Sequence, residues 1–359
     1  MISLSNREYS SPGCDAVKTR LSLVKREVDS LAKRLDEMAP QLEGRTVLVT
    51  GGAGFLGSWT CDLINALGGK VICVDNLISG SEENVAHLLG RKNFRLLKTG
   101  VQNLSLDDDV EYIVHMACLA SPPAYQKYPI ETLDTSVLGT RNVLEIAKGM
   151  NVEGILFTST SETYGDAKVV PTPEKYWGNV NPIGPRSVYD EGKRVAETYC
   201  KSYFEKFDVP IRVARIFNTY GPRLDVRSTS QYGRVVVKFI VQALSGNPLT
   251  VYGDGTQTRS FCYVTDVIEG LFKLLLVPGI DGETVNIGSD EEISVLSLAK
   301  IISELTGADS GNVFKPLPED DPRRRRPEIN KAEKLLGWKP KVSLKEGLEK
   351  TIDWISSMD

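Results

Sequence analysis

The chain has 359 residues, of which 41% are hydrophobic and 25% are charged, and its net charge is −4. This length allows one large domain or two smaller ones, and the slightly acidic balance does not favour binding to nucleic acid. The two histidines, His87 and His115, make a histidine-rich metal site or a Ser-His-Asp triad improbable, so we expect no metal. Six scattered cysteines, a polar N-terminus and the lack of a membrane-length apolar run favour a soluble, cytoplasmic protein that does not contact membranes.

Residues 1–44 differ in pattern from the rest of the chain. Their apolar residues recur at three- and four-residue steps, at Leu21, Val24, Val28, Leu31, Leu35 and Met38. This spacing predicts a helix with one apolar face. The face could pack on the helix's own domain or form a self-association seam. Because the seam is short for an independent coiled coil, we favour packing on its own domain.

From Arg45 onward, apolar strands alternate with helices. We expect strands at 46–50, 70–74, 94–98, 110–116, 155–160 and 211–217, with helices between them that include 131–150 and 189–207. Such alternation predicts an α/β fold, a Rossmann-type doubly wound parallel sheet covered by helices on both faces. The sequence therefore divides into an N-terminal helical extension at 1–44 and a Rossmann-type domain at 45–222.

The remaining part, 223–359, is predicted to form a smaller mixed α/β lobe that binds substrate. Its expected helices lie at 236–244, 295–306, 329–336 and 344–356, and Ser294 is a candidate N-cap for the second of them. We expect the segment 261–290 to return to the large domain.

A glycine-rich turn follows the first predicted strand and opens a helix. Gly51, Gly54 and Gly57, with Phe55 and Leu56 between them, fit the Gly-x-x-Gly-x-x-Gly pattern of a dinucleotide-binding turn. Glycine there lets the backbone approach a pyrophosphate at the helix N-terminus.

An acidic residue, Asp75, ends the second strand, where a carboxylate binds the hydroxyls of a ribose and repels a 2′-phosphate. Asn76, Ser79 and Gly80 follow it and are candidates for the rest of the adenosine pocket. The predicted cofactor is therefore NAD and not NADP.

Tyr189 and Lys193 stand four residues apart on a predicted helix, which places them on one face. A lysine ammonium beside a phenol favours the phenolate and lowers its pKa, so that Tyr189 could act as a general base. Thr160, upstream, could bind the same substrate oxygen. A tyrosine and a lysine at this spacing also occur on ordinary amphipathic helices, so the pair gains its meaning from the glycine turn that precedes it.

These motifs together resemble the extended short-chain dehydrogenase/reductase superfamily. The triplet Thr160-Ser161-Glu162, together with the runs 181–186, 189–194 and 214–223, is similar to UDP-glucuronate decarboxylases, also called UDP-xylose synthases. The 4,6-dehydratases carry Thr-Asp-Glu instead, and typical 4-epimerases lack the glutamate. The resemblance spans about 44–354. Departures from the family are Gly100, the run 134–136 (Asp-Thr-Ser) and a longer segment at 224–232.

The resemblance implies a decarboxylation of UDP-glucuronate to UDP-xylose through a 4-keto intermediate, with NAD regenerated in each turnover. It implies catalytic roles for Thr160, Ser161, Glu162, Tyr189, Lys193 and Arg325. It adds Ala117 and Thr219 to the NAD site, where Tyr189 and Lys193 also take part. The implied substrate-binding residues are Tyr125, Glu162, Tyr189, Asn218, Arg234, Tyr252, Gln257, Arg259 and Arg325.

The run of four arginines at 323–326 could indicate nucleic-acid binding, but in an acidic chain without interleaved aromatics it favours a solvated face. Arg325 is expected to point inward because its neighbours resemble the family's arginine-bearing loop. The resemblance also implies a homodimer, with helices 131–150 and 189–207 of each subunit forming a four-helix bundle. Alternatives for the activity are a UDP-sugar 4-epimerase, a UDP-galacturonate decarboxylase, or a non-catalytic NAD-sensing scaffold.

Overall fold

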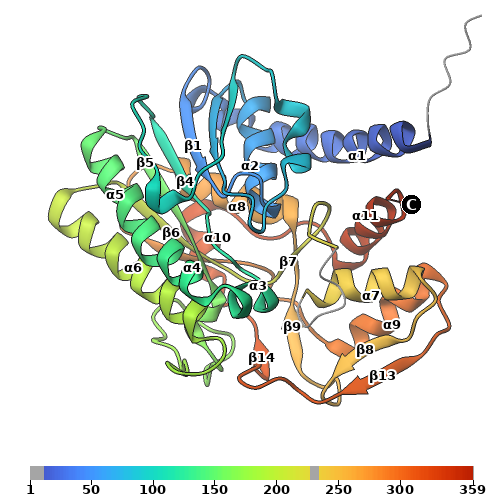
Figure 1. Cartoon of the computed structure of the whole chain (residues 1–359). Coiled ribbons are helices and arrows are strands. Elements are labelled where there is room, and N and C mark those ends of the chain that lie inside the picture. Colours follow the sequence, from blue (N-terminus) through green and yellow to red (C-terminus); the bar gives the residue numbers. More distant parts are fainter. Residues whose placement is uncertain (1–11, 227–233, 359) are drawn as a thin grey trace, which may run out of the picture.

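The computed structural model describes residues 12–226 and 234–358, and Figure 1 shows its arrangement. Its largest element is a parallel sheet of seven strands in the order β11-β6-β5-β4-β1-β2-β3. The strands are β1 (Thr46–Thr50), β2 (Lys70–Val74), β3 (Phe94–Leu97), β4 (Tyr112–His115), β5 (Gly154–Thr160), β6 (Ile211–Ile216) and β11 (Thr284–Ile287). This is the predicted Rossmann-type α/β fold, and β11 comes from the late segment 261–290.

The sheet is buried on both faces because most residues of its strands are apolar. In β1, Val47 and Val49 pack into one core cluster and Leu48 packs into the other. One cluster contains residues of α1 (Pro12–Arg34), α2 (Phe55–Ala66) and α8 (Val264–Leu276). The other contains residues of α5 (Thr140–Gly149) and α6 (Ser187–Phe207). Two helical layers therefore enclose the sheet, as Figure 1 shows.

The helix expected at 131–150 is interrupted. It consists of α4 (Pro129–Asp134), a π-helical segment (Thr135–Gly139) and α5. Within the segment the Thr140 hydroxyl donates a hydrogen bond of 2.6 Å to the carbonyl of Ser136. A π turn widens the backbone locally and is frequent at functional sites. Here it lies beside the sheet's carboxyl edge, where Thr135 lines a cavity described below.

Other short elements connect the layers. They are α3 (Pro122–Lys127), α10 (Asn330–Leu336), β7 (Thr219–Tyr220), β10 (Cys262–Tyr263) and the 3-10 turns at Asp36–Gln41, Glu82–Asn84, Ala86–Leu88, Val101–Asn103 and Ser161–Tyr164. None of the helices in the described ranges combines the length and the apolar character needed to cross a membrane.

A smaller lobe lies beside the carboxyl edge of the sheet. It contains α7 (Val235–Leu244), α9 (Val295–Thr306), α11 (Leu344–Ser356), β8 (Leu249–Tyr252), β9 (Thr258–Ser260), β12 (Glu292–Ser294), β13 (Asn312–Lys315) and β14 (Arg324–Arg325). The predicted N-cap is confirmed, because the Ser294 hydroxyl accepts the backbone N–H of Ser297 at 3.1 Å. β9 lies between β12 and β14, which fixes the basic residues of β9 and β14 side by side.

The N-terminal helix α1 packs on its own chain, as favoured from the sequence. Val24, Val28, Leu31 and Leu35 are buried in the core cluster that also contains α2 and α8. At the end of α1, Arg34 forms ion pairs of 3.0 Å with Asp266 and with Glu269 on α8. The helix ends at Arg34, earlier than the apolar pattern indicated, and Met38 lies in the 3-10 turn that follows.

We expect Leu31→Ala to lower the free energy of unfolding by about 2–5 kcal/mol, because it removes buried methyl groups from a packed site. Leu31 is 0% exposed, whereas Leu21 on the same helix is 37% exposed. The matched variant Leu21→Ala should change stability by less than about 0.5 kcal/mol. Denaturant unfolding measures both. A Leu31→Ala loss that grows with protein concentration would indicate instead that the helix face joins two chains.

Candidate active site

A cavity of about 420 Å³ opens at the carboxyl ends of the strands, between the sheet and the smaller lobe. This edge is where ligands bind in open α/β sheets. The cavity is lined by all the residues predicted for the site except Tyr125. The structure therefore brings together groups as far apart in the chain as Gly51 and Arg325.

The glycine turn has the geometry that a dinucleotide needs. Gly51 has a φ of 69°, in the left-handed region that favours glycine. A Cβ on Gly57 would lie 2.0 Å from the carbonyl oxygen of Gly51, so any side chain there would clash with the backbone of the turn. At the N-terminus of α2 the backbone therefore faces the cavity without side chains covering it. This arrangement fits the pyrophosphate of NAD.

Asp75 lines the same end of the cavity. Its carboxylate accepts the backbone N–H of Ala53 at 3.0 Å and that of Leu77 at 2.8 Å. Burial raises the pKa of Asp75, although these two hydrogen bonds act in the opposite direction. The carboxylate is held facing the space that the adenosine ribose of NAD would fill, and Asn76, Ser79 and Gly80 line the cavity beside it.

Tyr189 and Lys193 lie in the first turns of α6, and Thr160 ends β5. All three line the cavity, and a hydrogen bond from Thr160 stabilises the ionised form of Tyr189. The Lys193 Nζ donates to the carbonyl oxygen of Thr158 at 2.7 Å. Contrary to the sequence-based prediction, the pKa of Tyr189 is raised, because burial disfavours the phenolate and the neighbouring Cys118, Glu162 and Asp190 add to this effect.

Tyr125 does not line the cavity, which differs from its predicted contact with substrate. It is buried under Tyr189, with the two rings stacked at a centroid distance of 5.4 Å and an interplanar angle of 8°. Stacking of this kind fixes the plane of the Tyr189 ring. Tyr125 thus positions the candidate base by packing against the face of its ring.

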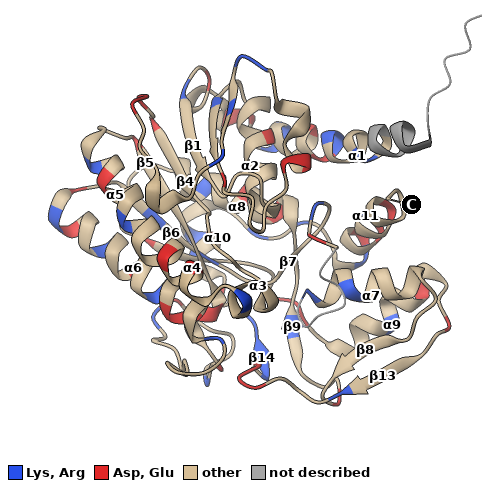
Figure 2. Ribbon diagram, in the orientation of Figure 1, with Lys and Arg blue, Asp and Glu red and all other residues tan. Residues whose placement is uncertain are grey.

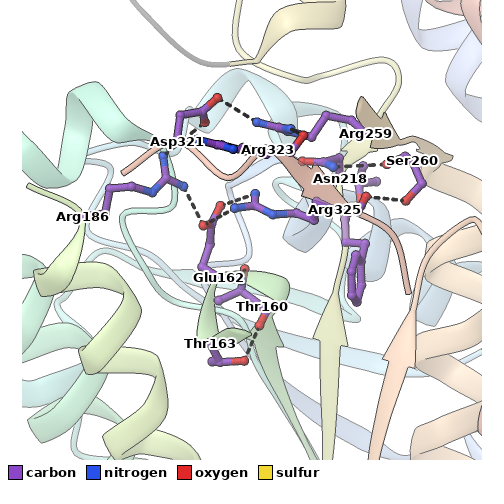
Figure 3. A network of polar contacts seen from close by, with 12 residues as sticks. Thr160, Glu162, Thr163, Arg186, Asn218, Arg259, Ser260, Asp321, Arg323 and Arg325 are labelled. Carbon is purple, nitrogen blue, oxygen red and sulfur yellow. Dashed lines mark hydrogen bonds and ion pairs between the residues drawn. The ribbon is translucent and has the colours of Figure 1, made fainter. Parts of the chain in front are cut away.

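Glu162 is the electrostatic centre of the site. Both of its oxygens accept hydrogen bonds of 2.6 Å from the Arg325 guanidinium, and Oε2 also accepts one of 2.6 Å from Arg186, as Figure 3 shows. Burial alone would raise the pKa of Glu162, but Arg325 and Arg186 lower it to about 2. Glu162 is therefore an ionised carboxylate near neutral pH. As predicted, Arg325 points inward, whereas Arg324 is exposed and pairs with Glu292 at 2.7 Å.

The smaller lobe supplies cationic and amide groups to the opposite wall. The Arg259 guanidinium pairs with Asp321 at 2.8 Å, and the Asn218 amide donates to the carbonyl of Ser260 at 3.2 Å. Gln257 donates to the carbonyl of Tyr252 at 2.6 Å. Figure 2 shows that β9 and β14 both carry basic residues. These side chains line the cavity together with Arg234, which pairs with Asp225 at 3.5 Å.

Three polar residues that line the cavity were not predicted from the sequence: Arg186, Lys238 and Asp321. The buried Asp190, next to Tyr189, was not predicted either. Arg186 and Asp190 flank Tyr189 in the family-like runs, and Asp321 precedes the arginine run. Their position beside the motifs could have indicated a role in the site, but only the fold shows which of these side chains face inward. Lys238 had no such signal. It lies on α7, with its Nζ 3.3 Å from the Tyr252 hydroxyl.

The family departures lie at the edge of the site. Thr99 and Val101, on either side of Gly100, line the cavity, as does Thr135 next to Asp134. In the longer segment at 224–232, residues 227–232 fall outside the described residues. Within the described ranges, no group of three or more His, Cys, Asp or Glu side chains could hold a metal ion.

Comparisons with known proteins agree with this geometry. The model of the NAD dependent epimerase/dehydratase family matches residues 47–288. UDP-glucuronic acid decarboxylase 1 of Danio rerio is 48% identical over 87% of this chain and 73% of its own length. UDP-glucuronic acid decarboxylase 2 of Arabidopsis thaliana is 49% identical over 85% of this chain and 67% of its own length.

A solved structure is also similar, that of UDP-glucuronic acid 4-epimerase from Bacillus cereus in complex with UDP-glucuronic acid and NAD. It is 29% identical, with a TM-score of 0.79, and the match covers 88% of this chain and all of that one (100%). The sequence relatives and the solved structure are thus similar to this chain over most of its length.

We expect Glu162→Gln to lower the free energy of unfolding by about 3–5 kcal/mol near neutral pH, because two buried arginines lose their counter-charge. The pKa of Glu162 is lowered to about 2, below its ordinary value of about 4.3. Its ion pairs therefore stabilise the fold above that ordinary value and lose their effect as the pH falls toward about 2. The stability difference between wild type and variant should shrink over the same interval in urea unfolding series.

The matched control is Glu191→Gln, a part-exposed glutamate that pairs with Arg194 at 3.5 Å. It should change stability by less than about 1 kcal/mol. Equal losses for the two variants would contradict a special role for the buried cluster.

Proposed function

Because the chain belongs to the NAD dependent epimerase/dehydratase family, we propose that it is an NAD-dependent decarboxylase that converts UDP-glucuronate to UDP-xylose through a 4-keto intermediate. The observation that carries this proposal is the ionised Glu162 held by Arg325 and Arg186 next to Thr160 and Tyr189. Relatives that are 48–49% identical carry the name UDP-glucuronic acid decarboxylase.

The cofactor and the protein have separate tasks in this reaction. NAD, when bound, supplies a reversible hydride acceptor whose positive ring charge favours a nearby phenolate. Tyr189 takes the proton of the C4 hydroxyl, and Thr160 binds the same oxygen. Lys193 adds a cationic group four residues after the base on the same face of α6. Because burial raises the pKa of Tyr189, we propose that the base is fully active only with the cofactor's charge in place.

The 4-keto sugar is a β-keto acid, so carbon dioxide can leave while the ketone accepts the electron pair. Arg325 and Glu162 face this part of the cavity with their mutual ion pair. In the proposed arrangement, Arg325 exchanges part of that pair for the substrate's carboxylate until carbon dioxide leaves. Ser161 orients the sugar at C5. When C4 is reduced again, Tyr189 would return the proton to the C4 oxygen, which completes the turnover.

The UDP moiety is proposed to lie along the smaller lobe. A diphosphate requires cations and hydrogen-bond donors, and arginine suits it because of its forked geometry. Arg234, Arg259 and Lys238 line that side of the cavity. Asn218, Tyr252 and Gln257 supply polar groups and an aromatic face for the sugar and the base.

For the whole molecule we propose the division into a helical extension (1–44), a NAD-binding domain (45–222, with 261–290) and a sugar-binding lobe (223–359). We also propose a reducing compartment, the cytoplasm. Its support is that Cys61, Cys73, Cys118, Cys200 and Cys262 are free thiols, as is usual where thiols are kept reduced.

A homodimer through α4, α5 and α6 is a further part of this proposal. These helices form the outer layer on one side of the sheet in Figure 1. Leu138 in the π segment is 51% exposed, and Val195 on α6 is 40% exposed. Exposed apolar side chains on neighbouring helices suit burial against a second copy.

Proton NMR of the purified protein with UDP-glucuronate and catalytic NAD tests the activity. We expect the UDP-xylose anomeric signal, an equal amount of carbon dioxide and no net reduced cofactor. Tyr189→Phe should lower turnover by about 10²–10⁴-fold, because the base is lost, while NAD binding measured by calorimetry remains.

Other products would contradict the proposal in distinct ways. Formation of UDP-galacturonate without carbon dioxide would indicate a 4-epimerase. Decarboxylation of UDP-galacturonate but not of UDP-glucuronate would indicate a UDP-galacturonate decarboxylase. Bound NAD without any turnover would indicate a sensing scaffold. Full turnover by Tyr189→Phe would remove Tyr189 from the mechanism.

The dimer is tested by light scattering after size exclusion. We expect Leu138→Glu to shift the protein from two chains toward one, because a buried charge disfavours the interface. Ile183, 91% exposed in the loop before α6, gives the control variant Ile183→Glu. Its mass should stay that of two chains. A single-chain mass for the wild type would refute the dimer.

A further inference from the structure

The reaction proposed above needs a proton that none of the predicted catalytic residues can easily supply. Decarboxylation replaces the C5–C6 bond with a C5–H bond, so one proton enters per turnover. Glu162 is ionised, with its pKa lowered to about 2 by Arg325 and Arg186 against the effect of burial. The proton on Tyr189 belongs to the C4 oxygen, and the hydroxyl of Ser161 is a poor acid.

Asp190 is a carboxyl group close to this cluster that has no assigned role. It follows Tyr189 in the first turn of α6 and is only 4% exposed. Its Oδ1 is buried and has no hydrogen-bond partner among the described residues. Buried polar atoms are nearly always partnered by protein or ordered water, so this oxygen requires a water or another ligand.

The side chain of Asp190 lines a second cavity, of about 320 Å³. Two residues, Arg186 and Asp321, line both this cavity and the reaction cavity. They therefore form the wall between the two spaces. The second cavity is polar, and its other charged residues are Asp166, Asp320 and Arg323. Such a space can hold water that exchanges protons with the solvent.

More unpartnered polar atoms surround the same wall. The Tyr125 hydroxyl, the Arg186 Nε and the Arg325 Nε are all buried without a hydrogen-bond partner among the described residues. Tyr125 interacts electrostatically with Asp190, Glu162, Arg186 and Arg325. Tyr125 stacks on the ring of Tyr189 and interacts electrostatically with Asp190, so it lies near both residues.

We propose that Asp190 is the proton reservoir of the reaction, which passes a proton from the second cavity through Tyr125 and ordered water to C5 of the substrate. The C5–C6 bond breaks, its electron pair enters the enolate of the 4-keto sugar, and carbon dioxide leaves. The enolate takes the proton that originates on the Asp190 carboxyl, forming the C5–H bond. The Asp190 carboxylate then regains a proton from solvent. This inference rests on the decarboxylase activity proposed above.

The charges around Asp190 are consistent with a protonated carboxyl near neutral pH. Burial first, and then the negative charge of Glu162, raise the pKa of Asp190 to about 8, with Glu191 adding to this effect. Arg186, before α6, and Arg325, on β14, act in the opposite direction. Tyr125 on α3 and the carboxylates of the second cavity complete the surroundings. The carboxyl is therefore protonated below about pH 8 and loses its proton above it.

The test compares wild type, Asp190→Asn and the control Glu205→Gln, an exposed glutamate of α6 that pairs with Lys201 at 3.0 Å, in single-turnover experiments with NAD-loaded enzyme. Absorbance reports the reduction of bound cofactor, and rapid quench reports carbon dioxide and UDP-xylose. We expect Asp190→Asn to reduce the cofactor at a rate within about twofold of wild type but to form UDP-xylose at least about tenfold more slowly, because proton delivery alone is affected. Glu205→Gln should match wild type in both steps.

The pH profile adds a readout that a merely structural role would not change. The wild-type kcat should fall as the pH rises through about 8. This descending limb should be absent in Asp190→Asn and return in Asp190→Glu, which restores a carboxyl group. Tyr125→Phe keeps the stacked ring, removes the hydroxyl, and should slow UDP-xylose formation without slowing cofactor reduction.

Three outcomes would overturn the proposal: UDP-xylose formation by Asp190→Asn at the control rate, a descending limb that persists in that variant, or full product formation by Tyr125→Phe. The last experiment decides the matter if Asp190→Asn does not fold. Failure of the proposed activity is distinguishable, because the wild type itself would then release no carbon dioxide.

Discussion

The structure depends on one buried ion cluster, in which Glu162 is held by Arg325 and Arg186. The three residues come from separate places in the chain: the turn after β5, the residue before α6, and β14. An unpaired charge in such a buried position costs several kcal/mol. The cluster can therefore form only when the large sheet, α6 and the smaller lobe are in their final arrangement. The cavity is therefore complete only in the correctly folded chain.

The same cluster decides how charge is distributed in the site. By lowering the pKa of Glu162, Arg325 and Arg186 make that residue a fixed anion and not an acid. A fixed anion in turn raises the pKa values of the neighbouring Tyr189 and Asp190. The site thus holds one carboxylate that stays ionised and one carboxyl that can hold a proton. Environments that separate the pKa values of two carboxyl groups in this way assign them different chemical tasks.

Backbone geometry and ring stacking also position the groups of the site. The glycine turn leaves the N-terminus of α2 bare toward the cavity, with Gly57 too close to the carbonyl of Gly51 for a side chain. Tyr125 lies flat under Tyr189 and fixes the direction in which its hydroxyl points. The stacked ring of Tyr125 and the hydrogen bond with Thr160 leave the candidate base little freedom, which is how a positioned proton acceptor gains efficiency.

The sequence by itself determined the α/β fold, the strands, the glycine turn, Asp75 and the residue types around Tyr189, because these follow from local periodicity and from fixed spacing along one strand or helix. It did not determine that Arg186 and Asp190 face the site, that Tyr125 stacks behind Tyr189, or that burial raises the pKa of Tyr189. Those properties depend on which segments meet across the cavity and on how deeply they are buried. Only the tertiary structure decides them, since desolvation and long-range ion pairing do not exist until the chain is folded.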